Sequence, residues 1–224
     1  MAAASAAVAA SGTVGTSSAS TTNGGVLVLG QSVSGTLRST SQRNDYTFTA
    51  SAGDVVFLRA HGTCVDGLYW GLFRPDGTRQ DFNLTCRDVG RQMLATSGTW
   101  TVQVYSDGTG AGAYAFSVLA SPALTTEAIS LGQAVTGSVD QIGAWHDYTF
   151  SASAGEVVSL KAQGTCVDLL YWELFRPDGI RQDFANSCGD MGRQVLHISG
   201  TWTVRIYSDT TATGGYAFTV SPSS

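Results

Sequence analysis

One long segment occurs twice in this sequence, in an unbroken register. The stretch GTCVDGLYWGLFRPDG, which begins at Gly62, returns as GTCVDLLYWELFRPDG at Gly164, a shift of 102 residues. The same shift carries Trp100 to Trp202. A repeated unit of roughly ninety residues has the size of an ordinary domain, so the sequence predicts two tandem modules. The expected parts are a low-complexity N-terminal segment at 1–25, module 1 at 26–120, a linker at 121–127 and module 2 at 128–224.

Both modules carry the pattern of antiparallel β-structure. Runs such as NDYTFTA, DVVFLRAH and TWTVQVYS alternate along the chain with a period of two and are rich in Val, Thr and aromatic residues. The tetrapeptide RPDG, at Arg74 and again at Arg176, has the Pro and Gly positions of a tight turn. The sequence therefore predicts an all-β chain of two tandem antiparallel β-sandwiches, jelly-roll-like in form.

The differences between the two copies predict which side chains face the core. Gly71 is replaced by Glu173, a change that is tolerated mainly where water reaches the side chain, so its neighbours on either side should point inward. The same comparison applies to Gln103 against Arg205 and to Phe57 against Ser159. The predicted core of module 1 is Leu68, Trp70, Leu72, Trp100, Val102, Val104, Val56, Leu58, Tyr46, Phe48, Tyr114 and Phe116.

Composition restricts the partners of the chain. Only 13% of the residues are charged, against about 25% in an average protein, and the net charge is −5. Nucleic acids and anionic membranes bind through concentrated positive charge, and no cluster of Lys and Arg is present. No run of about 18 apolar residues occurs either. We therefore expect neither nucleic-acid binding nor membrane insertion.

The four cysteines form two pairs with equal spacing. Cys64 and Cys86 are 22 residues apart, and so are Cys166 and Cys188. A zinc site would need closely spaced Cys pairs, which are absent from the sequence. One disulfide in each module is the simplest reading, with free buried thiols as the alternative. Disulfides persist in oxidising compartments, so we expect a secreted or cell-surface protein.

The motifs also carry a family resemblance. The stretches DYTFTASAGDVVFL, LYWGLFRPDG and GTWTVQVYSDGTGAGAYAFSV, repeated from DYTFSASAGEVVSL to GGYAFTV, resemble the bacterial pre-peptidase C-terminal domain. The resemblance implies a jelly-roll-like sandwich appended to secreted bacterial proteins, some relatives of which bind collagen or polysaccharide. The Cys pairs depart from the common pattern of that family, and no peptidase domain is attached.

No catalytic motif is present, and no cofactor is implied. His61 is replaced by Gln163 in the other copy, so the modules share no His-dependent chemistry, and we predict a protein that is not an enzyme. A carboxylate pair could in principle hydrolyse glycosides, but such compact modules suggest no deep site. The carboxylates nearest the disulfides need a cation, either ionic partners among Arg74, Arg91, Arg176 and Arg193 or a calcium ion. These carboxylates belong to Asp66, Asp88, Asp168 and Asp190.

Outward-facing aromatic residues form the only candidate recognition surface. Rings on a sheet can stack on sugars or pack against a protein, unless loops or the neighbouring module cover them. The candidates are Tyr69, Phe73 and Tyr105 in module 1 with Tyr171, Phe175 and Tyr207 in module 2.

The sequence favours a non-catalytic extracellular protein with a structural or adhesive role. Its partners would be further copies of itself or other extracellular proteins, and the alternative is an appendage that binds polysaccharide or a collagen-like matrix. In the N-terminal segment Val8, Ala10, Gly12 and Val14 alternate with Ala9, Ser11 and Thr13, which gives a possible strand one small apolar face. Such a strand could insert into a neighbouring copy and build a filament. The alternative for this segment is a signal-peptide remnant or a linker packed against its own module.

Overall fold

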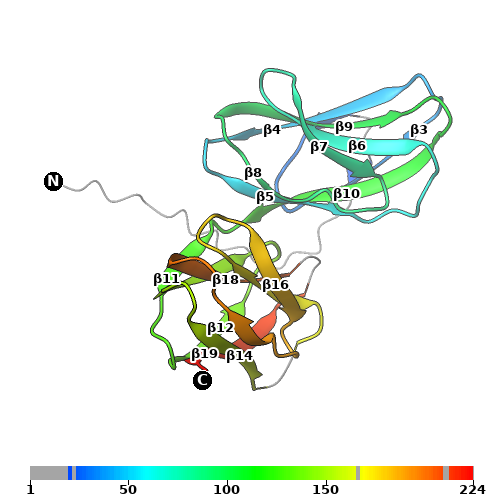
Figure 1. Ribbon diagram of the computed structural model, residues 1–224. Coiled ribbons are helices and arrows are strands. Elements are labelled where there is room, and N and C mark those ends of the chain that lie inside the picture. Colours follow the sequence, from blue (N-terminus) through cyan, green and yellow to red (C-terminus); the bar gives the residue numbers. More distant parts are fainter. Residues whose placement is uncertain (1–19, 22–23, 165–166, 209–211, 224) are drawn as a thin grey trace.

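The computed structural model describes residues 20–21, 24–164, 167–208 and 212–223. In these ranges the chain forms strands without any helix, and the strands make four sheets. Figure 1 shows the sheets grouped into two bodies, one from each half of the chain. The prediction of two tandem β-sandwiches is confirmed. No helix that could cross a membrane occurs in the described part of the chain.

Each sheet is named here after one of its strands. In module 1 the β3 sheet has the order β1 (Ser20–Thr21), β3 (Ser32–Leu37), β10 (Gly112–Ser121), β5 (Val55–Ala60) and β8 (Gly90–Met93). Opposite it lies the β4 sheet, with the order β2 (Gly25–Val26), β4 (Arg43–Ala50), β9 (Gly98–Ser106), β6 (Leu68–Phe73) and β7 (Arg79–Leu84).

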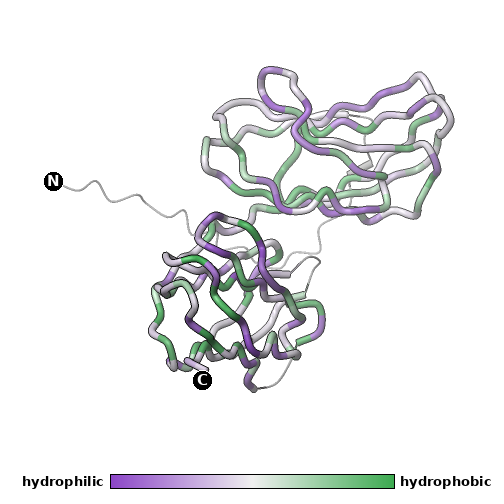
Figure 2. The backbone as a smooth tube through the Cα atoms, in the orientation of Figure 1, coloured by the Kyte–Doolittle hydropathy of each residue, from purple (hydrophilic) through white to green (hydrophobic). Residues whose placement is uncertain are grey.

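Module 2 repeats this plan with one strand fewer among the described residues. Its β13 sheet has the order β11 (Thr125–Ala128), β13 (Trp145–Ala152), β18 (Gly200–Ser208), β15 (Leu170–Phe175) and β16 (Arg181–Asn186). Its β12 sheet has the order β12 (Ala134–Val139), β19 (Gly214–Pro222), β14 (Val157–Gln163) and β17 (Gly192–Val195). Figure 2 shows hydrophobic and hydrophilic positions interleaved along the strands of both modules.

The predicted core residues lie between the two sheets of module 1. All twelve are buried, and they belong to one hydrophobic cluster. Buried indoles keep a hydrogen bond, because their N–H groups would otherwise lose water without replacement. Trp70 Nε1 donates to the carbonyl oxygen of Arg87 at 2.9 Å, and Trp172 repeats this bond to Gly189 at 3.0 Å.

A pair of phenols crosses each core. The hydroxyls of Tyr46 and Tyr114 are 2.6 Å apart, and those of Tyr148 and Tyr216 are 2.7 Å apart. Burial, followed by the hydrogen bond with Tyr46, raises the pKa of Tyr114. Tyr114 therefore stays protonated at physiological pH, and each hydroxyl pair joins its two sheets through a buried hydrogen bond.

The comparison of Gly71 with Glu173 predicted the inward residues correctly, but its premise that water reaches position 173 is wrong. Glu173 is largely shielded from bulk water, since only 7% of it is exposed. Its Oε1 accepts hydrogen bonds from Arg181 Nη1 at 2.6 Å and from the hydroxyl of Tyr207 at 3.1 Å. The outer position is thus covered by its own neighbours, and a buried charge is tolerated there because it is paired.

Phe57 is buried by the neighbouring module. It points away from the core of module 1, as the comparison with Ser159 predicts, yet it is only 2% exposed. Gly143 of module 2 lies against it, so closely that a Cβ at Gly143 would be 2.9 Å from the Phe57 ring. Gly143 also has a φ of 76°, which favours glycine. The backbone of module 2 therefore approaches module 1 without an intervening side chain.

Arg91 joins the same contact from β8. Its Nε donates to the carbonyl oxygen of Gly143 at 2.9 Å, and its guanidinium lies 4.5 Å from the ring of Trp145. Burial lowers the pKa of Arg91, and the nearby charge of Arg205 lowers it further. Both effects leave an arginine charged at neutral pH. Arg91 thus binds module 2 through one hydrogen bond and one cation–π contact.

The two copies differ in sequence where the modules meet. The loop of module 2 that contacts module 1 reads DQIGAW over 140–145, whereas the matching residues 38–43 of module 1 read RSTSQR. On the receiving face, Phe57 is matched by Ser159, and its cross-strand partner Leu119 is matched by Ser221. The contact face of module 1 is thus apolar at positions that are polar in module 2.

The double variant Phe57→Ser with Arg91→Ala should loosen the contact between the modules without unfolding them. Ser is the residue of module 2 at this position, so the sandwich accommodates it. The contact loses about 2 kcal/mol for a buried Phe and about 1 kcal/mol for the cation–π pair. Small-angle X-ray scattering should show a broader distance distribution with unchanged circular dichroism. Arg193→Ala, the matched change in module 2, is the control, and equal scattering from both variants would contradict the prediction.

Trp70→Ala should lower the free energy of unfolding by about 3 to 5 kcal/mol, because it leaves a large cavity in the core. Chemical denaturation followed by fluorescence measures the change. Phe82→Ala, at an exposed ring, serves as the control and should change stability by no more than about 0.5 kcal/mol. Equal denaturation midpoints for Trp70→Ala and the unmodified protein would show that the core is assigned incorrectly.

Candidate functional site

The outer surface of the β4 sheet presents a group of aromatic rings. Alternation along β6 and β9 turns Tyr69, Phe73 and Tyr105 away from the core, and all three are half-buried. The rings of Tyr69 and Tyr105 are stacked, with centroids 6.0 Å apart and an angle of 21° between their planes. Strand pairing produces this contact, since the two residues are directly opposite each other.

One ring of this group, and an arginine that contacts it, were not predicted from the sequence. Phe82 on β7 is 45% exposed, and its ring lies 6.1 Å from that of Tyr69. The guanidinium of Arg79 lies 4.1 Å from the Phe82 ring, and Arg79 Nη1 donates to the hydroxyl of Tyr105 at 3.1 Å. The stretch RQDF, which follows the RPDG turn in both copies, was the available signal. We call Tyr69, Phe73, Phe82 and Tyr105 the aromatic face of module 1.

The matching surface of module 2 holds more charge. Tyr207 lies 6.0 Å from Tyr171 and also 6.0 Å from Trp145, a ring that sequence analysis did not select. The guanidinium of Arg205 lies 4.4 Å from the ring of Trp145 and 5.1 Å from that of Phe175. Module 1 has Arg43 and Gln103 where module 2 has Trp145 and Arg205, so the sequence difference was a usable signal.

Arg205 is fixed in place by a carboxylate. Its Nε and Nη2 donate to the two oxygens of Asp147 at 2.7 and 2.8 Å. This fork geometry orients the guanidinium more strictly than a single contact would. Asp147 is buried, and 22% of the Arg205 side chain is exposed, so the pair is held at the edge of the solvent.

A groove of about 280 Å³ opens beside this ion pair. One wall is the ring of Phe175, and the others supply hydroxyl, guanidinium and carboxylate groups. Arg176, which lines the groove, pairs with Asp178 at 2.6 Å, and its buried Nε has no hydrogen-bond partner among the described residues. The groove thus combines an aromatic wall with donors and acceptors whose charges balance. Its lining residues are Asp147, Phe175, Arg176, Pro177, Gly179, Thr201, Thr203 and Arg205.

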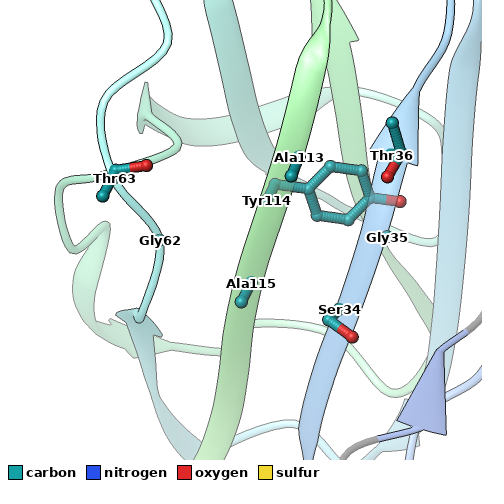
Figure 3. Close-up of a pocket in the computed structure, with 8 residues that line it drawn as sticks. All are labelled: Ser34, Gly35, Thr36, Gly62, Thr63, Ala113, Tyr114 and Ala115. Carbon is teal, nitrogen blue, oxygen red and sulfur yellow. The ribbon is translucent and has the colours of Figure 1, made fainter.

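A second groove, of about 340 Å³, lies over β3 and β10 of module 1. Figure 3 shows Tyr114 extending from β10 toward Gly35 and Thr36 of β3, while Gly62 and Thr63 lie on the other side of β10. Small side chains and hydroxyls make up its lining, which includes no ionisable group besides the phenol of Tyr114. That phenol is hydrogen-bonded to Tyr46 in the core, so the lining of the groove presents no group suited to catalysis.

One Ser–His contact occurs on the β3 sheet. His61 Nε2 lies 2.9 Å from Ser117 Oγ, the separation of a nucleophile and its base. Ser117 is buried, however, so a substrate has no access to its hydroxyl. Burial lowers the pKa of His61, and module 2 has Gln163 and Thr219 at the matching positions. The contact serves as a hydrogen bond within the fold.

The predicted ion pairs near the disulfides are not found among the described residues. Asp88 Oδ1 accepts a hydrogen bond from the backbone N–H of Ala60 at 2.7 Å, and Asp190 repeats this bond with Ala162 at 2.8 Å. The ion pairs found within the described ranges join none of the four candidate carboxylates to an arginine. No group of three His, Cys, Asp or Glu residues in this part of the chain could hold a metal ion. Calcium binding by Asp66, Asp88, Asp168 and Asp190 stays a prediction.

The first predicted disulfide is present. Cys64 and Cys86 are bonded, with their Cα atoms 4.7 Å apart. Cys188 is also disulfide-bonded, and its predicted partner Cys166 lies outside the described residues. A disulfide of this kind favours a compartment other than the cytoplasm.

Comparisons with known proteins find similarity in structure alone. No protein-family model and no curated protein matches the sequence. Among solved structures, the pre-peptidase C-terminal domain of collagenase from Bacillus anthracis matches with a TM-score of 0.34 and 16% identity, over 45% of this chain and 98% of that one. PliG from Aeromonas hydrophila, a periplasmic inhibitor of g-type lysozyme, matches with a TM-score of 0.39 and 17% identity, over 45% of this chain and 97% of that one.

Replacing both Cys64 and Cys86 by Ser should lower the free energy of unfolding of module 1 by about 3 kcal/mol, the value expected for a loop of this length. Urea denaturation measures the change, with the oxidised and the reduced unmodified protein as references. An unfolding midpoint that does not respond to the double replacement would contradict a stabilising role for the bridge.

Proposed function

We propose that this protein is a non-catalytic extracellular adhesive protein that binds polysaccharide through the outer faces of its β4 and β13 sheets. The observation that carries the proposal is the groove of module 2, where the Phe175 ring stands beside the Arg205–Asp147 pair. A sugar ring has one apolar face and several hydroxyls at its rim. An aromatic wall with oriented donors and acceptors matches both features.

The balance of charge in the groove favours a neutral ligand. Arg205 is neutralised by Asp147 and Arg176 by Asp178, so the groove offers many hydrogen bonds and little net charge. Adjacent hydroxyls of a sugar can both donate to a carboxylate and accept from a guanidinium. Thr201 and Thr203, which line the same groove, add hydroxyls that can do either.

The aromatic face of module 1 supports a second contact with the same polymer. Tyr69, Phe82 and Tyr105 form a continuous set of rings with Arg79 beside them. Two weak sites on one chain raise the overall affinity for a long ligand, because the second contact is made at a high effective concentration. The packing of Arg91 and Phe57 against module 2 limits how far the two sites can move apart.

The proposal does not include catalysis. The buried Ser117 and the paired carboxylates Asp147 and Glu173 support binding rather than proton transfer, since each is already occupied by a partner within the fold. Secretion is part of the proposal, and the disulfide between Cys64 and Cys86 supports it.

Self-assembly into a filament is the second candidate function. The sequence predicts a possible assembly strand within residues 1–25, of which 1–19 and 22–23 lie outside the described residues. What favours self-assembly is the pairing of Ser20 and Thr21 with the edge strand β3, because it shows that the end of this segment adopts extended structure along a sheet edge. Sedimentation velocity over a wide range of protein concentration tests the candidate directly, and a protein that stays monomeric would contradict it.

Phe175→Ala should weaken binding to the best polysaccharide ligand about tenfold, because it removes the stacking wall of the groove. Depletion of the protein by insoluble cellulose, xylan, chitin and peptidoglycan identifies the ligand, and titration with soluble fragments measures the affinity. Arg205→Gln, which introduces the residue of module 1, should have a similar effect. The matched change Phe73→Ala in module 1 separates the two sites.

Immobilised collagen is included as the probe for the alternative ligand. Binding to collagen with no binding to any polysaccharide would overturn the sugar proposal. Sugar binding that is unchanged by Phe175→Ala and Arg205→Gln would show that the groove of module 2 is not the site. Circular dichroism should show the fold intact, because Phe175 lies outside the core cluster and Gln is the residue of module 1 at the position of Arg205.

A further inference from the structure

The outer edge of β12 lacks a neighbouring strand among the residues that the structure describes. β12 pairs with β19 on one side, from Ala134 to Val139, and it is the last strand of its sheet on the other. The side chains of Ala134 and Thr136 are exposed. A free edge carries unpaired N–H and C=O groups, which can pair with another strand.

The matching edge of module 1 is covered by the chain itself. β3 is the counterpart of β12, and Ser20 and Thr21 pair with it in parallel, opposite Val33 and Ser34. The same shift places Pro122 and Ala123 where module 2 would need its covering strand. Proline has no N–H to give, and the carbonyl oxygen of Pro122 faces Arg91 in the contact between modules, 3.5 Å from Nη2. This part of the linker therefore contacts module 1 and does not pair with β12.

The linker leaves the first part of β12 accessible. Pro122, Ala123 and Thr125 line a small hollow with Ser138 and Asp140, which lie at the end of β12 and just beyond it. The edge from Ala134 to Gly137 stays open to a strand that approaches from the N-terminal end of β12. A parallel strand would enter there, as β1 does on β3.

The composition of β12 lacks the protection that other edges carry. Natural sheets discourage unwanted pairing with charged residues on their edge strands. The edge strands β7, β8, β11, β16 and β17 each contain a charged residue, and β2 has only two residues. β12 reads AVTGSV and contains neither a charged residue nor a proline. The same is true of β3, which reads SVSGTL and whose edge is covered. An edge without protection is consistent with one that is covered in the assembled state.

We propose that residues 1–19 of a second copy of this chain add as a parallel strand to Ala134–Gly137 of β12. The inference rests on the self-assembly part of the proposed function and names its acceptor. Ser20 and Thr21 stay on their own β3, where they pair with Val33 and Ser34 near the start of that strand. Nineteen extended residues reach roughly 60 Å, enough to meet a neighbouring module.

The small uncharged residues of the N-terminal segment suit this edge. Ala, Ser, Thr, Gly and Val make up nearly all of residues 1–19, the same kinds of residue as in β12 itself. One copy would donate from its first module and accept on its second. This head-to-tail contact uses two different surfaces, so it continues into a filament unless the rotation closes a ring.

Site-directed cross-linking tests the proposal. Donor variants carry Ala10→Cys, Gly12→Cys or Val14→Cys, and the acceptor variant carries Thr136→Cys. Each is purified separately, and donor and acceptor are mixed under mild oxidation. We expect a disulfide-linked heterodimer with at least one donor, identified by mass mapping. Ser34→Cys is the matched control acceptor, since its edge is already covered by Thr21, and it should give at least tenfold less product.

Deleting residues 2–19 provides the complementary test, because it removes the donor strand while leaving β1 and both sandwiches. The deletion should abolish any polymer seen by sedimentation velocity with an unchanged circular dichroism spectrum. An unmodified protein that stays monomeric would overturn self-assembly and this inference together. A polymer that forms without cross-linking at Thr136→Cys, or that cross-links equally at Ser34→Cys, would overturn the β12 acceptor and leave self-assembly standing. A discrete dimer of Thr136→Cys with itself would indicate that two β12 edges pair, which also overturns the proposal.

Discussion

Each module depends on burying its indole and phenol rings between two sheets. Trp70, Trp100 and Tyr46 fill the space in module 1, and their counterparts do so in module 2. Because side chains alternate along a strand, fixing these rings inward also fixes which residues face outward. The aromatic face of module 1 and the groove of module 2 are therefore the reverse sides of the strands that build the cores.

This alternation explains how much could be predicted from the sequence. The period of two gave the sandwich fold, the core and the outward positions of Tyr69, Phe73 and Tyr105. It could not give Phe82, because β7 follows a turn, and a bulge between Leu72 and Phe73 shifts the register of β7 against β6. It also misjudged Glu173, since a position that alternation turns outward can still be covered by long neighbours such as Arg181. The burial of Phe57 depends on a contact between modules, which no pattern within one strand records.

The two copies share a core and differ outside it. Residues that pack inside a sandwich are constrained by volume, so substitutions there are costly and the copies remain alike. Outer positions have no such constraint and can acquire separate roles. Module 2 has Trp145 and Arg205 where module 1 has Arg43 and Gln103, and these changes create both the contact with Arg91 and the ion pair of the groove. Comparing the copies position by position is therefore more informative about function than either copy alone.

Trp145 links the joint between the modules to the groove. The guanidinium of Arg91, from module 1, and that of Arg205, from the groove, lie 4.5 and 4.4 Å from the same ring. Two cations near one another are unfavourable unless an anion offsets them, and Asp147 supplies that charge through its bond to Arg205. Removing any one of these groups changes the environment of the others. The contact of module 1 with module 2 and the orientation of Arg205 in the groove thus share one network of side chains.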